Sequence, residues 1–401
     1  MIKFKIENNK LVNCLTDEKV VKIPDNITYI DSKAFFNNKC IEEVIIGDNV
    51  LNMGHSVFSG CSSFKKVQLS KNIQNIPYGT FYSCHNLEEI NLNKVCSISS
   101  LAFYECNKLT KVNLSKEIDD LDSNAFTNCD NLLEININKK NKYFTSVDGI
   151  VYSKDLSTLV VYPSGRKNSE FTIPEHVTKL CEKTFIENKY INKVIFPTQV
   201  KEIPNHYFNS CENLKYVNFP NNLSKISFFA FVNCSSLESI IIPDNVEIIG
   251  QGAFQDCKSL KYIKLNENLK ILDNECFKDC ISLEEVILPN GLNKICKGLF
   301  AGCINLTKLY IPKSIIEIDE GFIKNVKQGI NIIYEGSSND WNELTKDRNV
   351  LVQTSSINDF HYYGSWAEMM VPDVYEKEII IQKNLKYTVQ CLEDNKVITV
   401  E

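Results

Sequence analysis

The sequence predicts a solenoid, a fold in which short turns of chain stack on one another. The stretch from Ile242 to Pro312 repeats one pattern three times, V/L-x-x-I-x-x-x-x-F-x-x-C-x-x-L-x-x-V/I/L-x-I/L. Its phenylalanines, Phe254, Phe277 and Phe300, are separated by 23 residues each time. A fixed period of about 20–29 residues around an L-x-x-L-x-L core is typical of leucine-rich repeats, whose turns bury their apolar sides against their neighbours.

Twelve phenylalanines occupy this position of the repeat. They follow one another at steps of 23 residues, except for steps of 22 that end at Phe103 and Phe322 and a step of 59 that ends at Phe185. The sequence therefore predicts a leucine-rich-repeat superhelix of the α/β type with about twelve turns of 23 residues, rich in β-strand, with short 3₁₀ turns at the F-x-x-C segments. The set is Phe35, Phe58, Phe81, Phe103, Phe126, Phe185, Phe208, Phe231, Phe254, Phe277, Phe300 and Phe322.

Each L-x-x-V-x-L segment is expected to form a strand whose side chains alternate between the core and solvent. In the turn that follows Phe277, Val286 and Leu288 would point inward, and Glu285 and Ile287 outward. The residues equivalent to Glu285 therefore form an exposed row, with one residue from each turn.

The chain is predicted to have three parts: an N-terminal β cap at 1–22, the solenoid at 23–345 and a C-terminal β cap at 346–401. Caps are needed because the end turns would otherwise expose core and unpaired strand edges. The long step contains 59 − 23 = 36 extra residues, which predicts an inserted β-hairpin at 138–170 with strands at 147–152 and 158–162.

The two ends show their own patterns. FKIENNKLVNC and EKVVKIP each read as a strand, joined by a turn at Thr16-Asp17-Glu18. SNDWNEL predicts a short helix capped by Ser338 or Asn339. EKEIIIQKN and KYTVQCLEDNKVITVE alternate like strands and are expected to pair, while FHYYGSWAEMM, with His361 and Trp366, is expected to cover the last turn.

Nine of the sixteen cysteines lie three residues after a repeat phenylalanine, which is a packing register and not a pairing scheme. We expect reduced thiols buried as small apolar groups. No C-x-x-C occurs and the histidines lack ligand spacing, so no metal site is expected. The nine are Cys61, Cys84, Cys106, Cys129, Cys211, Cys234, Cys257, Cys280 and Cys303.

The turn V-x-x-I-x-x-x-x-F-x-x-C-x-x-L-x-x-V-x-I-P resembles the BspA-like class of bacterial and protist leucine-rich repeats. Residues 146–167, SVDGIVYSKDLSTLVVYPSGRK, are similar to the hairpin that interrupts many members, and 333–344, IYEGSSNDWNEL, to their common last repeat. The resemblance implies interaction or adhesion, often at a cell surface, and implies no catalytic residues.

Composition excludes several classes of protein. The net charge of -6 argues against nucleic-acid binding, and the lack of an apolar run long enough for a bilayer argues against membrane insertion. MIKFKIENNK lacks the apolar core of a signal peptide, which predicts a cytoplasmic location; the resemblance instead favours the cell surface or non-classical secretion. No phosphate-binding loop, dinucleotide, zinc-protease or nucleophile-elbow motif occurs, so we expect a monomeric non-enzyme without a cofactor.

The exposed strand positions are the candidate binding face. In the first five turns their charges alternate in sign, which predicts ion pairs that stabilise the array and no strong field for a ligand. The row is Glu43, Lys66, Glu89, Lys111, Glu134, Lys193, Tyr216, Ser239, Tyr262, Glu285 and Lys308.

The second half of this face carries aromatic and aliphatic groups beside lysines, a composition that suits a protein-binding patch. The candidate partner-binding residues are Lys215, Tyr216, Ile241, Lys261, Tyr262, Ile287 and Tyr310. The predicted function is a protein-interaction or adhesion module whose partner is a host or cell-surface protein.

Three alternatives stay open. The same tyrosines could stack on the rings of a glycan. The cationic residues of the hairpin, Lys154, Arg166 and Lys167, could bind a partner because they project from the scaffold. An enzyme in the tail 345–401 is the third alternative.

Overall fold

The computed structural model describes residues 2–327, 329–346 and 387–400. The chain is a β-solenoid of about 14 turns, the fold class that the repeat predicts. Its residues form two compact units, each described here by itself. Unit 1 comprises Met1–Asn168 and His176–Tyr190, and unit 2 comprises Ser169–Glu175 and Ile191–Glu401.

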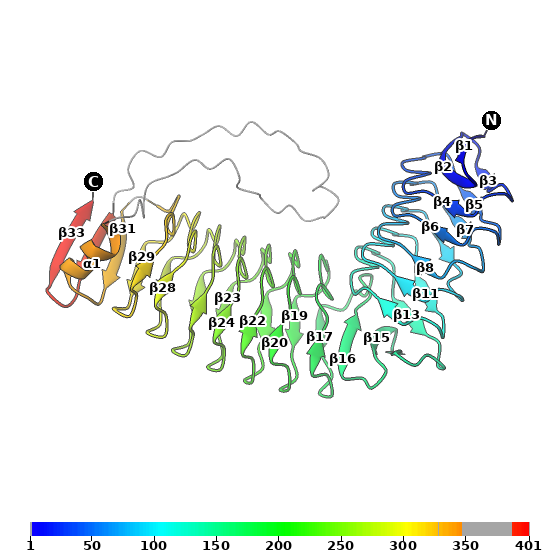
Figure 1. Ribbon diagram of the computed structural model, residues 1–401. Helices are drawn as coiled ribbons and strands as arrows, with labels where there is room; N and C mark the ends of the chain where they lie inside the picture. The colour runs from blue at the N-terminus through cyan, green and yellow to red at the C-terminus, as the bar shows by residue number, and fades with distance from the viewer. Residues whose placement is uncertain (1, 328, 347–386, 401) are drawn as a thin grey trace. The chain divides into compact units, whose positions relative to one another are not determined.

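A repeat turn contributes two strands, and most strands pair in parallel with the equivalent strand of a neighbouring turn (Figure 1). The first comes from the L-x-x-V-x-L segment, and we call these strands the first row. The second has two residues, and these strands form the second row. Register follows the repeat: Val44 pairs with Val67, and Val67 with Ile90.

Unit 1 has an N-terminal hairpin, two strand rows and an inserted group of strands. The hairpin is β1 (Lys3–Glu7) and β2 (Lys10–Leu15). The first row is β3 (Val20–Lys22), β5 (Glu43–Ile45), β7 (Lys66–Gln68), β9 (Glu89–Ile90), β11 (Lys111–Leu114) and β13 (Glu134–Ile137). The second row is β4 (Tyr29–Ile30), β6 (Asn52–Met53), β8 (Asn75–Ile76), β10 (Ser97–Ile98), β12 (Asp120–Leu121) and β18 (Lys179–Leu180).

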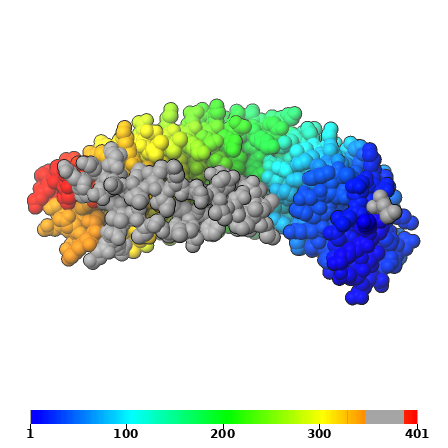
Figure 2. All heavy atoms as spheres, turned by 90° about the horizontal axis from the view of Figure 1, so that it is seen from above, coloured from blue at the N-terminus to red at the C-terminus, as the bar shows by residue number. Residues whose placement is uncertain are grey.

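Unit 2 has the same two rows and ends in a cap; in the space-filling view its green and yellow turns follow one another as packed layers (Figure 2). The first row is β17 (Glu170–Thr172), β19 (Lys193–Ile195), β21 (Tyr216–Asn218), β23 (Ser239–Ile241), β25 (Tyr262–Lys264), β27 (Glu285–Ile287), β29 (Lys308–Ile311) and β31 (Ile330–Tyr334). The second row is β20 (Glu202–Ile203), β22 (Lys225–Ile226), β24 (Ile248–Ile249), β26 (Ile271–Leu272), β28 (Lys294–Ile295) and β30 (Glu317–Ile318).

The repeat phenylalanines form the centre of each core. Their rings stack from turn to turn, with centroids 4.9 Å apart for Phe103 and Phe126 and 5.8 Å for Phe277 and Phe300. The nine register cysteines are buried, as expected. For eight of them the thiol donates a hydrogen bond to the carbonyl of the phenylalanine one turn earlier, as Cys61 does to Phe35 at 3.0 Å.

The F-x-x-C segments are tight bends held by hydrogen bonds between residues three apart. Cys61 donates its N–H to the carbonyl of Phe58 at 3.1 Å. The second residue after each phenylalanine usually has a positive φ, such as 76° at Gly60 and 58° at Asn37. That left-handed residue ends the bend after one turn and sends the chain into the next strand.

The predicted alternation along the first row is confirmed. Val286 and Leu288 are buried, whereas Glu285 and Ile287 are exposed. The N-terminal run FKIENNKLVNC was expected to be one strand, and this expectation is wrong. It is the antiparallel hairpin β1–β2, because Asn8 and Asn9 adopt φ values of 49° and 60°, the left-handed pair of a tight hairpin turn.

The insertion contains three strands, β14 (Phe144–Val147), β15 (Ile150–Ser153) and β16 (Thr158–Val161), where the sequence predicted two. The expected strand at 147–152 is interrupted because Asp148 and Gly149 form a left-handed hairpin turn, with φ of 47° and 74°. β16 then lies parallel to β18 and so joins the second row.

The C-terminal cap extends the first row of unit 2. β32 (Tyr387–Cys391) pairs with β31 in parallel and with β33 (Lys396–Val400) antiparallel. Helix α1 (Ser338–Thr345) begins one residue earlier than predicted: its N-cap is Ser337, because Ser337 and Asp340 form a reciprocal capping box. The runs EKEIIIQKN and FHYYGSWAEMM, with His361 and Trp366, lie outside the described residues.

Candidate binding face

The first row of unit 2 carries an apolar side chain on its outer surface in four consecutive turns. Each strand presents two outward positions on either side of one inward residue, which is half-buried in β21 and buried in β23, β25 and β27. Tyr216 and Tyr262 take the first outward position of β21 and β25, and Ile241 and Ile287 the second of β23 and β27. The four side chains therefore alternate between two columns, and we call this set the apolar zigzag.

All four side chains of the apolar zigzag are largely exposed. Tyr216 and Tyr262 are each 54% exposed, Ile241 is 64% and Ile287 is 62% exposed. The polar residues Asn218, Ser239, Lys264 and Glu285 occupy the alternate positions of the two columns.

The other three candidate residues lie around the zigzag in different ways. Tyr310 pairs in register with Ile287 and is half-buried, because the ammonium of Lys308 lies over its ring, 4.8 Å from the centroid. Lys215 and Lys261 are exposed and immediately precede β21 and β25. Neither of these two ammonium groups stacks on a described ring, so they supply charge at the edge of the face.

The charge row of unit 1 is paired at one place only among the described residues. Lys111 and Glu134 are register partners, and their side chains form an ion pair at 3.0 Å that lowers the pKa of Glu134. Glu43, Lys66 and Glu89 are also register partners, but their charged groups form no ion pair with one another.

A second column of unit 1 was missed by the sequence analysis, which considered only the first outward position in that half of the array. The second position carries a side-chain amide in four consecutive turns, Gln68, Asn91, Asn113 and Asn136. The signal was present, because each of these residues lies between the two inward residues of a V-x-L-like segment.

The hairpin cations differ in their surroundings. The guanidinium of Arg166 donates to the carbonyls of Asp148 at 2.6 Å and Leu133 at 3.3 Å, and lies 5.9 Å from the centre of the Tyr162 ring. Arg166 therefore fastens the insertion to the preceding turn. Lys154 and Lys167 are exposed.

The described residues offer neither a metal-binding cluster nor a membrane-spanning helix. They contain no group of three or more His, Cys, Asp or Glu side chains arranged to hold a metal ion. No helix within them has both the length and the apolar character that crossing a bilayer requires.

Comparison with protein-family models decides the family. The model for the BspA type leucine rich repeat region matches in six copies, over residues 5–133, 93–147, 163–254 and 225–343. The chain belongs to this family. BspA-type leucine-rich-repeat proteins are generally interaction or adhesion scaffolds without enzymatic activity, and many are found at the cell surface.

Solved structures of similar fold agree with this assignment. A leucine-rich repeat protein from Eubacterium ventriosum is 19% identical, with a TM-score of 0.57 over 78% of this chain and 92% of that one. The pneumococcal vaccine antigen PcpA is 20% identical, with a TM-score of 0.51 over 82% of this chain and 78% of that one. At these identities the likeness shows the fold alone. None of the curated proteins compared with the chain matches it.

Proposed function

We propose that this BspA-type chain is a protein-interaction module that binds its partner through the first strand row of unit 2. The observation that supports this most strongly is the apolar zigzag, because four large apolar side chains stand outward in consecutive turns. Contiguous exposed apolar surface in a soluble protein commonly marks an interaction site.

The composition of the face favours a protein as the partner. Tyrosine is among the residues that most often dominate binding energy, because its ring buries a large area with few torsions to fix. The rim carries both signs of charge, with Lys215 and Lys261 alternating with Glu238 and Glu284 from turn to turn, which favours a partner whose rim also carries both signs around an apolar centre.

The rigidity of the face also supports the proposal. The residues between the outward positions, such as Ile240, Ile263 and Val286, are buried in the core of the solenoid. The outward side chains therefore start from fixed backbone, and binding requires little ordering of the main chain.

Photo-crosslinking tests the proposal. A photoreactive phenylalanine analogue at Tyr262 should capture a defined protein from the native cell, and the same analogue at Tyr143 should not. Tyr143 is the matched control because it is also 54% exposed but lies in unit 1.

The captured protein is then purified and its affinity for the chain is measured. Tyr216→Ala with Tyr262→Ala should weaken binding by about tenfold or more, while Tyr143→Ala leaves it unchanged. Because more than half of each tyrosine is exposed, the melting temperature should stay within about 2 °C of the wild type. Equal affinity of the double variant and the wild type would remove this face as the binding site.

A further inference from the structure

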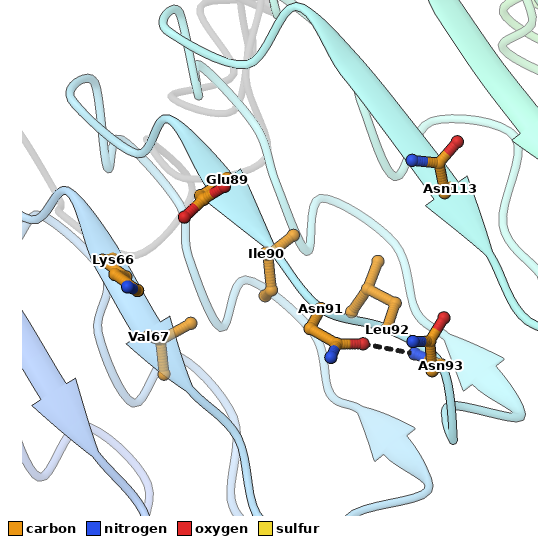
Figure 3. Close-up of a pocket in the computed structure, with 8 residues that line it drawn as sticks. All are labelled: Lys66, Val67, Glu89, Ile90, Asn91, Leu92, Asn93 and Asn113. Carbon is orange, nitrogen blue, oxygen red and sulfur yellow. Dashed lines mark hydrogen bonds between the residues drawn. The ribbon is translucent and has the colours of Figure 1, made fainter.

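A hollow of about 300 Å³ opens in the first row of unit 1. Figure 3 shows its polar lining, Lys66 from β7, Glu89 from β9, Asn113 from β11, and Asn91 and Asn93 from the segment after β9. Ile90 forms part of its floor together with two buried apolar residues. The hollow therefore joins hydrogen-bonding walls to an apolar base.

A single missing residue creates this hollow. Val67 and Ile90 are register partners 23 residues apart, but Asn75 and Ser97, in the second row of the same turns, are 22 apart. The later of these two turns is therefore one residue shorter, and the shortening falls after β9, which is only two residues long. The segment after β9 pairs with β11 at an isolated bridge, between Leu92 and Leu114. Ile90 is half-buried, whereas its equivalents in the neighbouring turns, Val67 and Val112, are buried.

Two polar residues that line the hollow, Asn91 and Asn113, belong to a column of side-chain amides, which we call the amide column and define as Gln68, Asn91, Asn113 and Asn136. Asn136 donates to the amide oxygen of Asn113 at 3.4 Å, and Asn91 accepts from the N–H of Asn93 at 3.0 Å. The amide nitrogens of Asn91 and Asn113 donate to no described residue. They face solvent and are available to a ligand.

The charges beside the amide column cancel. Lys66, Glu89, Lys111 and Glu134 alternate in sign along neighbouring strands, and Lys111 and Glu134 are already paired. A polyanion such as a nucleic acid or a sulfated glycan would meet as many carboxylates as ammonium groups. The face therefore suits a neutral ligand rich in hydrogen-bonding groups.

We infer that the amide column binds a neutral, unbranched polysaccharide in an extended conformation, with one sugar ring seated in the hollow. Parallel strands lie about 4.8 Å apart, which is close to the length of one 1,4-linked pyranose unit, so each amide can meet one sugar. The hydroxyl groups would hydrogen-bond to the amides and to Lys66 and Glu89, and the C–H face of one ring would rest on Ile90.

A peptide fits this spacing less well. The hydrogen-bonding groups on one side of an extended peptide recur every two residues, or about 6.6 Å. They would drift out of step with the amide column within two turns.

The inference does not rest on the proposed function, because the amide column lies in unit 1 and the apolar zigzag in unit 2.

Isothermal titration of the full chain with β-1,4-linked glucose oligosaccharides of increasing length tests the inference. Binding should strengthen with each added ring until the oligosaccharide spans the four turns of the amide column, and should not strengthen beyond that length. An extended glycine- and serine-rich peptide and heparin should not compete.

The variant Asn91→Ala with Asn113→Ala should weaken binding by about tenfold or more, because two hydrogen-bonding groups are lost. The matched control is Asn218→Ala, at the same position of β21 in unit 2. Asn91, Asn113 and Asn218 are all exposed, so the circular dichroism spectra of these variants should match that of the wild type. The absence of binding by the wild type, an unchanged affinity of the double variant, or displacement by the peptide would each overturn the inference.

Discussion

The thiol of Cys84 donates a hydrogen bond to the carbonyl oxygen of Phe58, at 3.1 Å, and so joins two adjacent turns inside the core of unit 1. Both residues are fully buried, and the same carbonyl also accepts the N–H of Cys61 at 3.1 Å, so the thiol is its second donor in a place that water does not reach. This contact explains why the repeat combines phenylalanine with cysteine three residues later. The ring stacks on its equivalents, and the small thiol fills the remaining space and supplies a donor.

Replacing Cys84 with alanine should therefore destabilise unit 1 although no disulfide is lost. We expect the free energy of unfolding to fall by about 1–3 kcal/mol, because a buried carbonyl loses one of its two donors and a small cavity forms. The change in stability is measured by chemical denaturation, with far-UV circular dichroism as the signal. Cys40→Ala, at an exposed cysteine, is the control, and equal stability of the two variants would contradict the argument.

Thiol reactivity should divide the cysteines by burial. Burial raises the pKa of Cys61 and Cys14 to about 12, so these thiols stay protonated and unreactive at neutral pH. In the native protein a thiol reagent should modify the exposed Cys40 first. After unfolding without reductant it should modify all sixteen cysteines of the sequence; a total near zero would mean that they form disulfides.

The parts of the fold that depend on the local repeat could be predicted from the sequence. Phe254 and Cys257 recur with a constant period, and each occurrence has the same neighbours above and below, so one turn defines the next. The hairpin turn at Asp148-Gly149 was missed although the dipeptide is a strong turn signal, because the flanking apolar residues read as one continuous strand.

The candidate site was predicted less completely, for two physical reasons. Tyr216 and Ile241 were found because outward positions follow from strand alternation. The hollow could not be predicted, because its opening depends on how the backbone is arranged near Asn91, where the repeat is one residue shorter. The contact between Tyr104 and Glu187 could not be predicted either, because it spans 83 positions in the sequence, far beyond one period of the repeat.

Asn141 is expected to hold the insertion in place. It is 2% exposed, its amide nitrogen donates to the carbonyl of Ile118 at 2.7 Å, and its oxygen accepts from the N–H groups of Tyr143 and Phe144 at 2.8 and 2.7 Å. Asn141→Ala should lower the free energy of unfolding by about 1–3 kcal/mol because these buried groups lose their partners.

Hydrogen exchange measures where the effect of Asn141→Ala falls. The amides of β14 and β15 should exchange faster, while those of β5 and β7 keep their protection. Asn131→Ala is the control, since Asn131 is exposed and donates one hydrogen bond, to the carbonyl of Asn107 at 2.7 Å. Faster exchange throughout unit 1 would mean that Asn141 supports the whole unit and not the insertion.

Glu187 should make the stability of unit 1 depend on pH. It accepts hydrogen bonds from the Tyr104 hydroxyl at 2.8 Å and from the Asn128 amide, and desolvation by burial raises its pKa to about 7. Glu105 raises the pKa further, whereas Lys189 lowers it. Because the folded-state pKa lies above the unfolded value of 4.5, the unfolded state loses its proton first as pH rises.

The stabilising contribution of protonated Glu187 is therefore complete below about pH 4.5 and is lost as the pH rises to about 7. Protonated Glu187 contributes at most about 3 kcal/mol to the free energy of unfolding, because a pKa difference of one corresponds to about 1.4 kcal/mol. Glu187→Gln keeps an acceptor for Tyr104 and removes the charge, so the variant should be more stable than the wild type at pH 8 and equal to it near pH 4. Denaturation curves across this range measure the difference, with Glu88→Gln as the control because Glu88 is an exposed carboxyl of the same unit. The contradicting outcome is that the stabilities of the wild type and of Glu187→Gln change in parallel between pH 4 and pH 8. Glu187 would then have to be ionised in the folded state throughout this range. The buried carboxyl would not be the source of the pH dependence.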